Sequence, residues 1–426
     1  MSCKLTQIEN GVEGIFVKNE RFSTTLISFH FYLPLKKETA AGYSLLPFLM
    51  TTCSEKYPDF SKLNYKLSKL YGASLEASAE KVGDLQSLKI AVSVIDDKYA
   101  LDGEALCEQA CELLLRLIFA PKVENGEFAK EDVEREKRKA IEHIRGEFAE
   151  KRVYARKRLI EEMYGDDDFA TPKCGTEEQV AELDGKALYE MWKTLLSKAF
   201  VRVNVISSNL PNGLFEKIGE HFAAFDRTDI TDRFAHRPTA PRSEVKEVTE
   251  RMDLSQGKLS IGFSCDTSGD DYATGALAVM CDILGGGPYS KLFSNVREKM
   301  SLCYYCSSSA IRIKGLLTVD SGVESQNAET AKNAILDQLN AIKNGEISDF
   351  EFSSSKKSLT DGLCTVNDSQ AGIDAWYATR ISNRNLMSPE DFAKTIENVT
   401  RENIIATANG IKLHTVYRLL PKEVKA

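Results

Sequence analysis

The sequence is poor in histidine, a common ligand of catalytic metals. Only five of its 426 residues are histidines, and no two of them are spaced to share a helix face as a ligand pair. No combined cluster of cysteine and histidine at metal-ligand spacing takes their place. The sequence therefore predicts no metal site in this chain, whose histidines are His30, His143, His221, His236 and His414.

Targeting segments and excess positive charge are also missing. The first residues lack an apolar core followed by a cleavage site, and no run of about 18 apolar residues occurs. The net charge of -8 argues against a nucleic-acid partner, which would need a basic face. Ten cysteines without a signal sequence suggest reduced thiols. We therefore expect a cytoplasmic protein that neither crosses a membrane nor binds nucleic acid.

The order of predicted elements favours an α+β fold in two domains. Predicted strands, then helices, then strands follow one another without strict alternation. The stretch 127–164 is expected to be helical. Its buried stripe is expected to contain Val133, Ala140, Ile144 and Phe148. A polar, aperiodic stretch with two prolines at 227–247 predicts a linker between a domain at 1–226 and a domain at 248–426. The second domain repeats the coarse element order of the first, which suggests duplication.

The stretch from Gly285 to Ser309 combines a glycine turn, a helix and a strand. Gly285, Gly286 and Gly287 let the backbone turn tightly or come close to another chain. Apolar residues at helical spacing follow, with Arg297 off their face and Tyr304 seven residues further on. A guanidinium and a phenol are thus expected together at a helix-to-strand junction. The alternative for this pair is an arginine bound to a nearby carboxylate and a tyrosine in the core.

Cys303 and Cys306 form a C-x-x-C within the predicted strand. Two central tyrosines and an extended setting suit a redox or zinc pair poorly, so a structural role is favoured.

The phrase GGGPYSKLFSNVREKMSLCYY resembles the C-terminal-half signature of the pitrilysin/insulysin-type zinc metallopeptidases, which include the mitochondrial processing peptidases. Three further phrases are similar to the family: PKVENGEFAKEDVEREKRKAIEHI, KCGTEEQVAELDGKALYEMWKTLLS and NGEISDFEFSSSKKSL. The resemblance covers nearly the whole chain. It implies two similar α+β domains, each an antiparallel sheet packed by helices, arranged as a clamshell around an extended peptide. It also implies that Arg297 and Tyr304 bind the substrate carbonyl and oxyanion, with the three glycines at the rim.

The family's metal motif, His-x-x-Glu-His, is replaced in this chain by apolar residues. Laid on the family pattern, the two histidine positions are Leu45 and Leu49, and the glutamate position is Phe48. None of these side chains can bind zinc or accept a proton, and Pro47 between them removes a helix hydrogen bond and is expected to favour a kink.

The third ligand position of the family falls on His143, or on Glu142 after a slip of one residue; Glu136 matches another acidic position. One isolated ligand is not a site, so a solvated charged face is the favoured interpretation of these three residues.

The resemblance implies an inactive, zinc-less subunit of a two-chain peptidase. It would form a heterodimer with a zinc-bearing homologue, bind peptide and supply Arg297 and Tyr304 in trans; no cofactor is expected in this chain, and zinc is expected in the partner. A homodimer is the alternative for the chain alone. The pattern is similar to cytosolic bacterial subunits linked to modification of elongation factor P with 5-aminopentanol. Two other hypotheses stay open: a non-enzymatic peptide clamp or scaffold, and a self-sufficient enzyme with an unrecognised centre.

Overall fold

The computed structural model describes residues 2–266, 271–383 and 385–422, which belong to two compact units. Unit 1 comprises Met1–Arg145, Thr171–Ala235 and Ser369–Ile381, and unit 2 comprises Gly146–Ala170, His236–Asp368 and Ser382–Ala426. The expected linker at 227–247 begins in unit 1 and ends in unit 2. A domain boundary at that linker stays a prediction, and residues 1 and 423–426 of the expected domains lie outside the described residues.

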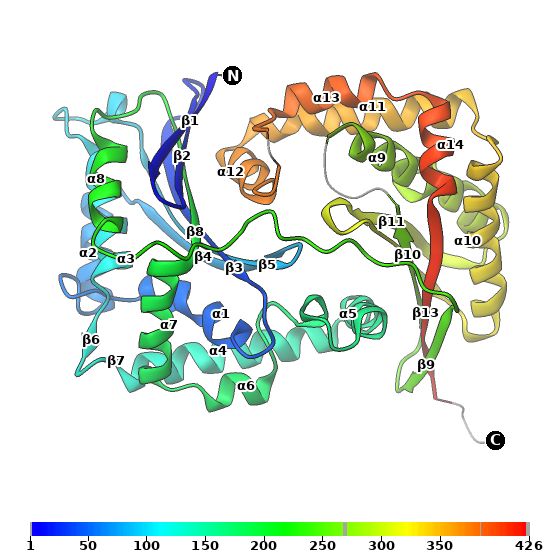
Figure 1. The fold of residues 1–426 in the computed structure, drawn as a ribbon, viewed down its shortest axis with the longest axis horizontal. Helices are drawn as coiled ribbons and strands as arrows, with labels where there is room; N and C mark the ends of the chain where they lie inside the picture. The colour runs from blue at the N-terminus through cyan, green and yellow to red at the C-terminus, as the bar shows by residue number, and fades with distance from the viewer. Residues whose placement is uncertain (1, 267–270, 384, 423–426) are drawn as a thin grey trace. The chain divides into compact units, whose positions relative to one another are not determined.

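Unit 1 is built on a six-stranded sheet in the order β1-β2-β8-β3-β5-β4 (Figure 1). Its neighbouring strands are antiparallel except for β2 and β8, which are parallel. Since β4 lies at an edge, one side of its backbone is left without a strand partner in this sheet. The strands are β1 (Ser2–Glu9), β2 (Val12–Lys18), β3 (Thr24–Pro34), β4 (Ser74–Val82), β5 (Leu85–Ile95) and β8 (Phe200–Ser207).

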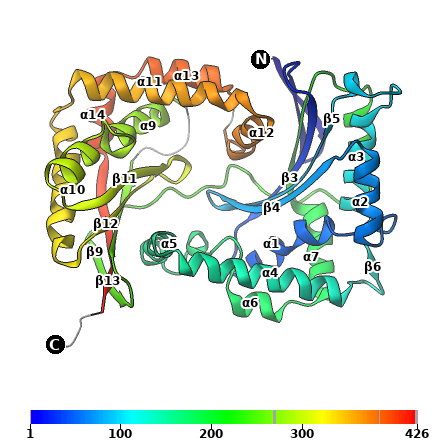
Figure 2. The ribbon, with the colours of Figure 1, turned by 180° about the vertical axis from the view of Figure 1, so that it is seen from behind.

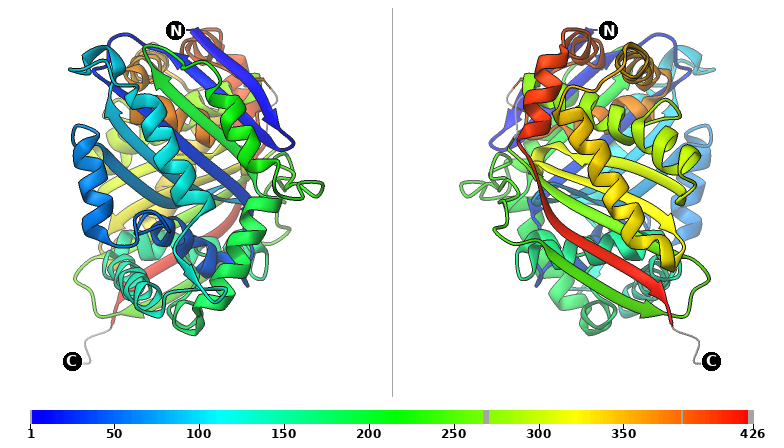
Figure 3. Two further views of the ribbon diagram at one scale, coloured as in Figure 1. Left: turned by 90° about the vertical axis from the view of Figure 1, so that its left-hand side faces the viewer. Right: turned by 90° about the vertical axis from the view of Figure 1, so that its right-hand side faces the viewer.

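Helices cover both faces of the unit 1 sheet. One face packs against α1, α3 and α7, and the other packs against α12; Figure 3 shows α3 and α8 crossing the strands. The helices are α1 (Ala40–Met50), α2 (Phe60–Lys69), α3 (Leu106–Phe119), α4 (Lys130–Ala149), α6 (Glu177–Glu182), α7 (Gly185–Lys198), α8 (Leu214–Phe222) and α12 (Gln370–Thr379).

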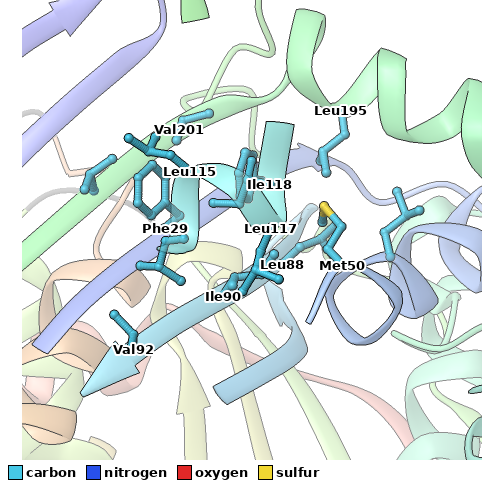
Figure 4. Packing of buried hydrophobic residues seen from close by; sticks show 14 of the residues in the cluster. Phe29, Met50, Leu88, Ile90, Val92, Leu115, Leu117, Ile118, Leu195 and Val201 are labelled. Atoms are coloured by element: carbon cyan, nitrogen blue, oxygen red, sulfur yellow. The ribbon is translucent and has the colours of Figure 1, made fainter. Parts of the chain in front are cut away.

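The alternation of side chains along β3 explains why both faces are covered. Phe29 and Phe31 point to the helical core, where Figure 4 shows Phe29 among Leu115, Ile118 and Val201. Ser28 and His30, which alternate with them, face α12 instead, because successive side chains of a strand point to opposite sides. This strand is buried from Thr25 to Leu33, with an apolar face toward one layer and polar side chains toward the other.

Unit 2 is built on a five-stranded sheet in the order β11-β12-β10-β13-β9. Neighbouring strands are antiparallel except for β9 and β13. Numbered within each unit, and leaving out β1, both sheets have the order 1-5-2-4-3 with the parallel pair in the same place. This matches the expectation that the two halves share an element order. The strands are β9 (Lys246–Met252), β10 (Gly257–Cys265), β11 (Cys303–Ile311), β12 (Leu316–Val323) and β13 (Ile411–Pro421).

The sheet of unit 2 also has helices on both faces. Figures 1 and 2 show α10 on one side of the strands and α5 on the other. Buried residues of α5, among them Leu159 and Met163, pack with Leu316, Tyr417 and Leu419 of the sheet. The helical segments are α5 (Lys151–Tyr164), α9 (Asp271–Gly285), η3 (Leu292–Lys299), α10 (Ala328–Lys343), α11 (Asp349–Thr365), α13 (Pro389–Glu397) and α14 (Arg401–Asn409).

The covering helices α5 and α12 are exchanged between the halves of the chain. Helix α5 follows the long helix α4 of the first half but packs on the sheet of unit 2, and α12 follows α11 of the second half but packs on the sheet of unit 1. The α+β class is confirmed. Because of the exchange, neither unit is one continuous stretch of the sequence.

The expected helix at 127–164 is wrong at its start. Glu127 belongs to a short hairpin, β6 (Val123–Glu124) with β7 (Glu127–Phe128). Asn125 and Gly126 connect the two strands with φ angles of 53° and 79°, and an Asn-Gly pair is favoured where a tight hairpin needs two positive φ angles.

The helix expected in this stretch is interrupted again at Glu150. Its carboxylate accepts a hydrogen bond from the backbone amide of Arg152 at 3.1 Å and so caps α5. Of the expected buried stripe, Val133 is buried and Ala140 and Ile144 pack partly against the core. Phe148 is exposed, because the last residues of α4 belong to unit 2 and leave the core of unit 1. The chain that the structure describes contains no helix long and apolar enough to cross a bilayer.

Candidate functional site

Arg297 lies on η3, which is a π-helix and not the α-helix that the apolar spacing predicts. The amide of Met300 donates to the carbonyl of Asn295 at 2.9 Å, a bond that spans five residues. Short π-helical segments are rare and frequently occur at functional sites. The irregular turn thus marks Arg297 as a candidate functional residue.

The side chain of Arg297 reaches the surface of unit 2. Its guanidinium lies 4.5 Å from the centroid of the Phe293 ring, and its Nε lies 3.5 Å from a carboxylate oxygen of Glu298. The side chain is 40% exposed, so the weak pairing with Glu298 leaves the guanidinium accessible to solvent.

Tyr304 stands at the start of β11, an edge strand of the unit 2 sheet. The register with β12 shifts between Cys303 and Tyr305, which lie opposite adjacent residues of β12. Tyr304 is thus the additional residue of a β-bulge. Its side chain is 61% exposed, and its hydroxyl lies 3.4 Å from a carboxylate oxygen of Glu324. Because η3 packs on β11, Arg297 and Tyr304 lie on neighbouring elements of one unit.

Gly285 is the last residue of α9, Gly286 and Gly287 follow it, and Gly285 allows this helix to approach β11. A Cβ atom at Gly285 would lie 2.6 Å from the amide nitrogen of Ser308 and 2.9 Å from a methyl carbon of Leu292. Gly286 and Gly287 are more open to solvent. Internal packing is therefore sufficient to explain Gly285, and a peptide-binding role for the three glycines stays a prediction.

The structure brings the degenerate metal positions of the two helices together. Leu45 and Phe48 of α1 and Glu136 and His143 of α4 line one cavity of about 300 Å³ in unit 1. Leu45 is buried and Phe48 is exposed at the mouth. Four positions that the resemblance matches to the metal site of the family thus meet in space, although nearly a hundred residues separate Leu45 from His143.

Leu49 is directed elsewhere: it is buried in the apolar core of unit 1. Helix α1 continues through Pro47 and ends at Met50. A second cavity, of about 620 Å³, shares Phe48 and Glu136 with the first. Carbon side chains occupy the key positions, so the residues present do not fit zinc.

The prediction of a solvated face is wrong for Glu136, whose side chain is 3% exposed. Its carboxylate lies 3.0 Å from Nε of Arg135 and 3.0 Å from Nζ of Lys139, so both cations compensate its burial. Glu142 and His143 are exposed, as a solvated face requires. Across residues 2–266, 271–383 and 385–422, no three side chains of His, Cys, Asp or Glu are placed to hold a metal ion.

Sequence reasoning missed a buried polar cluster in unit 1 that is centred on Asp374 of α12. Its carboxylate lies 2.9 Å from Nε2 of His30, accepts from Asn204 at 2.8 Å and lies 3.1 Å from Nζ of Lys89. Burial alone would raise the pKa of Asp374, but the charges and hydrogen bonds of its neighbours, above all His30, hold it well below its usual range. No local pattern joins these residues, so no sequence signal could have found them.

The chain has a two-unit α+β fold, apolar residues where the resemblance places the metal ligands, and an accessible arginine and tyrosine. These features define a metallopeptidase-like protein without its metal centre. A family model described as "Peptidase M16 inactive domain" matches residues 183–359. The chain is 32% identical to "Probable inactive metalloprotease YmfF" of Bacillus subtilis (strain 168), over 98% of this chain and 97% of that protein. It belongs to the M16 family of peptidases, and the inactive descriptions fit a chain without zinc.

Two further similarities bear on fold and kinship. The crystal structure of a conserved protein from Enterococcus faecalis V583 superposes with a TM-score of 0.91 at 27% identity and covers 100% of both chains. "Uncharacterized zinc protease YmxG", also of Bacillus subtilis (strain 168), is 24% identical over 48% of this chain and 49% of that protein. The first similarity extends over the entire fold, and the second over half of each chain.

Proposed function

We propose that this chain is the non-catalytic subunit of a two-chain peptidase. In this proposal it binds an extended peptide and supplies Arg297 and Tyr304 to the active site of a zinc-bearing homologous partner. The partner polarises the attacking water, and the guanidinium and phenol of this chain hold the scissile carbonyl as its oxygen gains charge. The chain alone hydrolyses nothing.

One observation carries the proposal. Arg297 and Tyr304 are accessible on adjacent elements, whereas apolar side chains stand at the positions that the resemblance matches to the metal motif. A core role would bury the phenol, but Tyr304 is 61% exposed on a bulge. A purely structural arginine would make a close ion pair, but Nε of Arg297 lies 3.5 Å from Glu298, a neighbour in sequence. Both groups are free to meet a ligand that approaches this face of unit 2.

Two sheet edges could take up the backbone of an extended peptide. In unit 1 one edge strand is β4, and Ser78, Ala79 and Glu80 of this strand line the cavity at the degenerate metal position. In unit 2 the edge strand is β11, which carries Tyr304. Addition of a peptide strand to such an edge provides main-chain hydrogen bonds, with neighbouring pockets for alternate side chains.

The partner is expected to be a homologue that keeps its zinc ligands. Relatives of this chain in Bacillus subtilis (strain 168) include one named "Probable inactive metalloprotease YmfF" and one named "Uncharacterized zinc protease YmxG". Such a pair is what a divided active site requires. Within this proposal we place the heterodimer in the bacterial cytoplasm, with modification of elongation factor P as the process to test first.

A mixing assay tests the proposal. The purified chain, a zinc-bearing homologue from the same organism and their mixture are each incubated with unstructured peptides. We expect cleavage only in the mixture, and Arg297→Ala or Tyr304→Phe in this chain should lower its turnover on the order of 10²-fold. Lys299→Ala, on the same π-helix, and Tyr65→Phe, on the exposed face of α2, are the matched controls and should leave turnover unchanged.

The alternative function is a peptide clamp without hydrolysis, which the closed metal position and the open strand edges also allow. In that case the chain binds peptide with similar affinity alone and in the mixture, and the two substitutions change binding but not cleavage. Cleavage by the chain alone that chelators abolish would refute both functions.

A further inference from the structure

The β-bulge in β11 brings the two thiols of the C-x-x-C motif onto one face. In a regular strand, residues three apart point to opposite faces. Here Tyr304 is an additional residue, so Cys303 and Cys306 lie opposite Val323 and Ser321, which are two residues apart on β12. Both cysteines are buried, with exposures of 8% and 7%. The bulge thus turns Tyr304 outward and pairs two cysteines beneath it.

The spacing on this face permits a disulfide. Positions two residues apart along a strand lie about 6.6 Å from each other. Disulfides form between Cα atoms up to about 6.8 Å apart, and most join closer ones. A disulfide also needs the two Cβ atoms within about 4.5 Å, so closing the bond requires a tighter bulge than the reduced strand has.

The other residues of β11 confirm which face holds the thiols. Ser308, further along the same face, donates its hydroxyl to the carbonyl of Cys281 in α9 at 2.6 Å. Tyr305 points the other way: its ring lies 4.4 Å from the guanidinium of Arg152, and a side chain on Gly322 would collide with it. The two thiols therefore lie between the sheet and the helical layer that contains α9 and η3.

The environment makes the two sulfur atoms unequal. The thiol of Cys306 donates a hydrogen bond to Cys303; this bond lowers the pKa of Cys303, burial opposes the effect, and the positive charge of Arg297 lowers the pKa further. The same bond and burial raise the pKa of Cys306. Because the thiolate is the reactive form, Cys303 is the expected nucleophile and Cys306 the resolving thiol.

We propose that Cys303 and Cys306 are a peroxide-oxidisable pair that closes to a reversible intrachain disulfide and tightens the bulge that carries Tyr304. The thiolate of Cys303 attacks one oxygen of a hydroperoxide; an S–O bond forms, the O–O bond breaks, and the leaving oxygen takes a proton. The thiol of Cys306 then attacks the sulfenic sulfur; an S–S bond forms, the S–O bond breaks, and water leaves. Two thiols are oxidised and one hydroperoxide is reduced. This inference does not depend on the proposed function.

The disulfide would act on the residues around it. Tyr304 lies between the two cysteines in sequence, and η3 with Arg297 packs on the same strand. A tighter bulge moves the backbone on both sides of Tyr304. Oxidation therefore changes how this phenol is presented, whereas the rest of β11 keeps its pairing with β12.

The test exposes the purified full-length chain to a small excess of hydrogen peroxide, followed by denaturation, alkylation and peptide mass mapping. We expect one disulfide between Cys303 and Cys306, a mass loss of about 2 Da, and restoration by dithiothreitol. Cys265 and Cys281 are the internal controls, because they are also buried in unit 2 but burial raises their pKa values to about 12 and about 11. They should react at least about tenfold more slowly.

Two serine variants assign the roles. In Cys306→Ser, a sulfenic-acid trap such as dimedone should label Cys303; in Cys303→Ser, neither trap nor disulfide should appear at residue 306. Hydrogen exchange of the wild-type chain supplies a readout without substitution, and amides at 303–306 should exchange several-fold more slowly after oxidation. Peroxide that oxidises the exposed Cys364 while Cys303 and Cys306 stay alkylatable would overturn the proposal. Exchange at 303–306 that is unchanged in the disulfide form would overturn the effect on the bulge.

Discussion

Nε2 of His30 lies 2.9 Å from Oδ1 of Asp374, although 344 residues separate them in the chain. This contact joins the polar face of β3 to the covering helix α12. Asn204 of β8 and Lys89 of β5 bind the same carboxylate, so three central strands of one sheet are linked to a helix from the other half of the sequence. The packing of α12, which comes from the second half of the chain, therefore contributes to the stability of unit 1.

Replacement of Asp374 by asparagine should destabilise unit 1 strongly. The amide cannot compensate the charge of Lys89, and removal of one partner from a buried ion pair costs about 3–5 kcal/mol. Denaturant unfolding, followed by intrinsic fluorescence, measures the change. Asp361→Asn, on the exposed side of α11, is the matched control and should stay within about 0.5 kcal/mol of wild type. An equal effect of both substitutions would contradict the structural role of the cluster.

Acid should weaken the protein through the same carboxylate. The pKa of Asp374 is lower in the folded state than in the unfolded chain, where it lies near about 4. Its stabilising contribution is therefore present above about pH 4 and is lost as the pH falls below that value, because the unfolded state then binds a proton that the folded state does not. Unfolding free energies measured from pH 6 to pH 3 should decline more steeply for wild type than for Asp374→Asn. Parallel curves would show that another carboxylate controls the acid limit.

Alanine should have opposite effects at two helical glycines of unit 2. At Gly285 the new Cβ would lie 2.6 Å from backbone of β11, so we expect destabilisation of about 1–3 kcal/mol. At Gly362, in α11, a Cβ meets nothing within 4 Å, and alanine should stabilise by about 0.5–1 kcal/mol through its higher helix propensity. Thermal unfolding of both variants measures the contrast. A gain in stability for Gly285→Ala would mean that this helix and strand are not so close.

The purified chain should contain less than about one-tenth equivalent of zinc, because a closed site needs three or four ligands and the positions at Leu45, Phe48 and Leu49 offer none. Elemental analysis after dialysis measures the content, with a zinc-bearing homologue prepared in parallel as the positive control. A stoichiometric ion that survives dialysis would contradict the apolar replacement of the metal site.

Local patterns were sufficient for much of the fold. The glycine turn before Arg297 follows from turn chemistry, and the helical character of most of 127–164 follows from its apolar spacing; both depend on neighbours in sequence. The absence of a His-x-x-Glu-His motif also needs no coordinates, since it is read directly from the sequence. Errors arose at Glu127 and Glu150, where a charged, helix-favouring composition concealed a hairpin and a second helix start.

The sequence alone determined the family resemblance, the α+β class and the absence of a His-x-x-Glu-His motif. Tertiary structure decided that Glu136 is buried between Arg135 and Lys139, that α5 and α12 exchange sheets, and that one additional residue at Tyr304 places two cysteines on the same face. The physical reason is that strand register and helix docking depend on partners far away in the chain, whereas composition and spacing report only on neighbours.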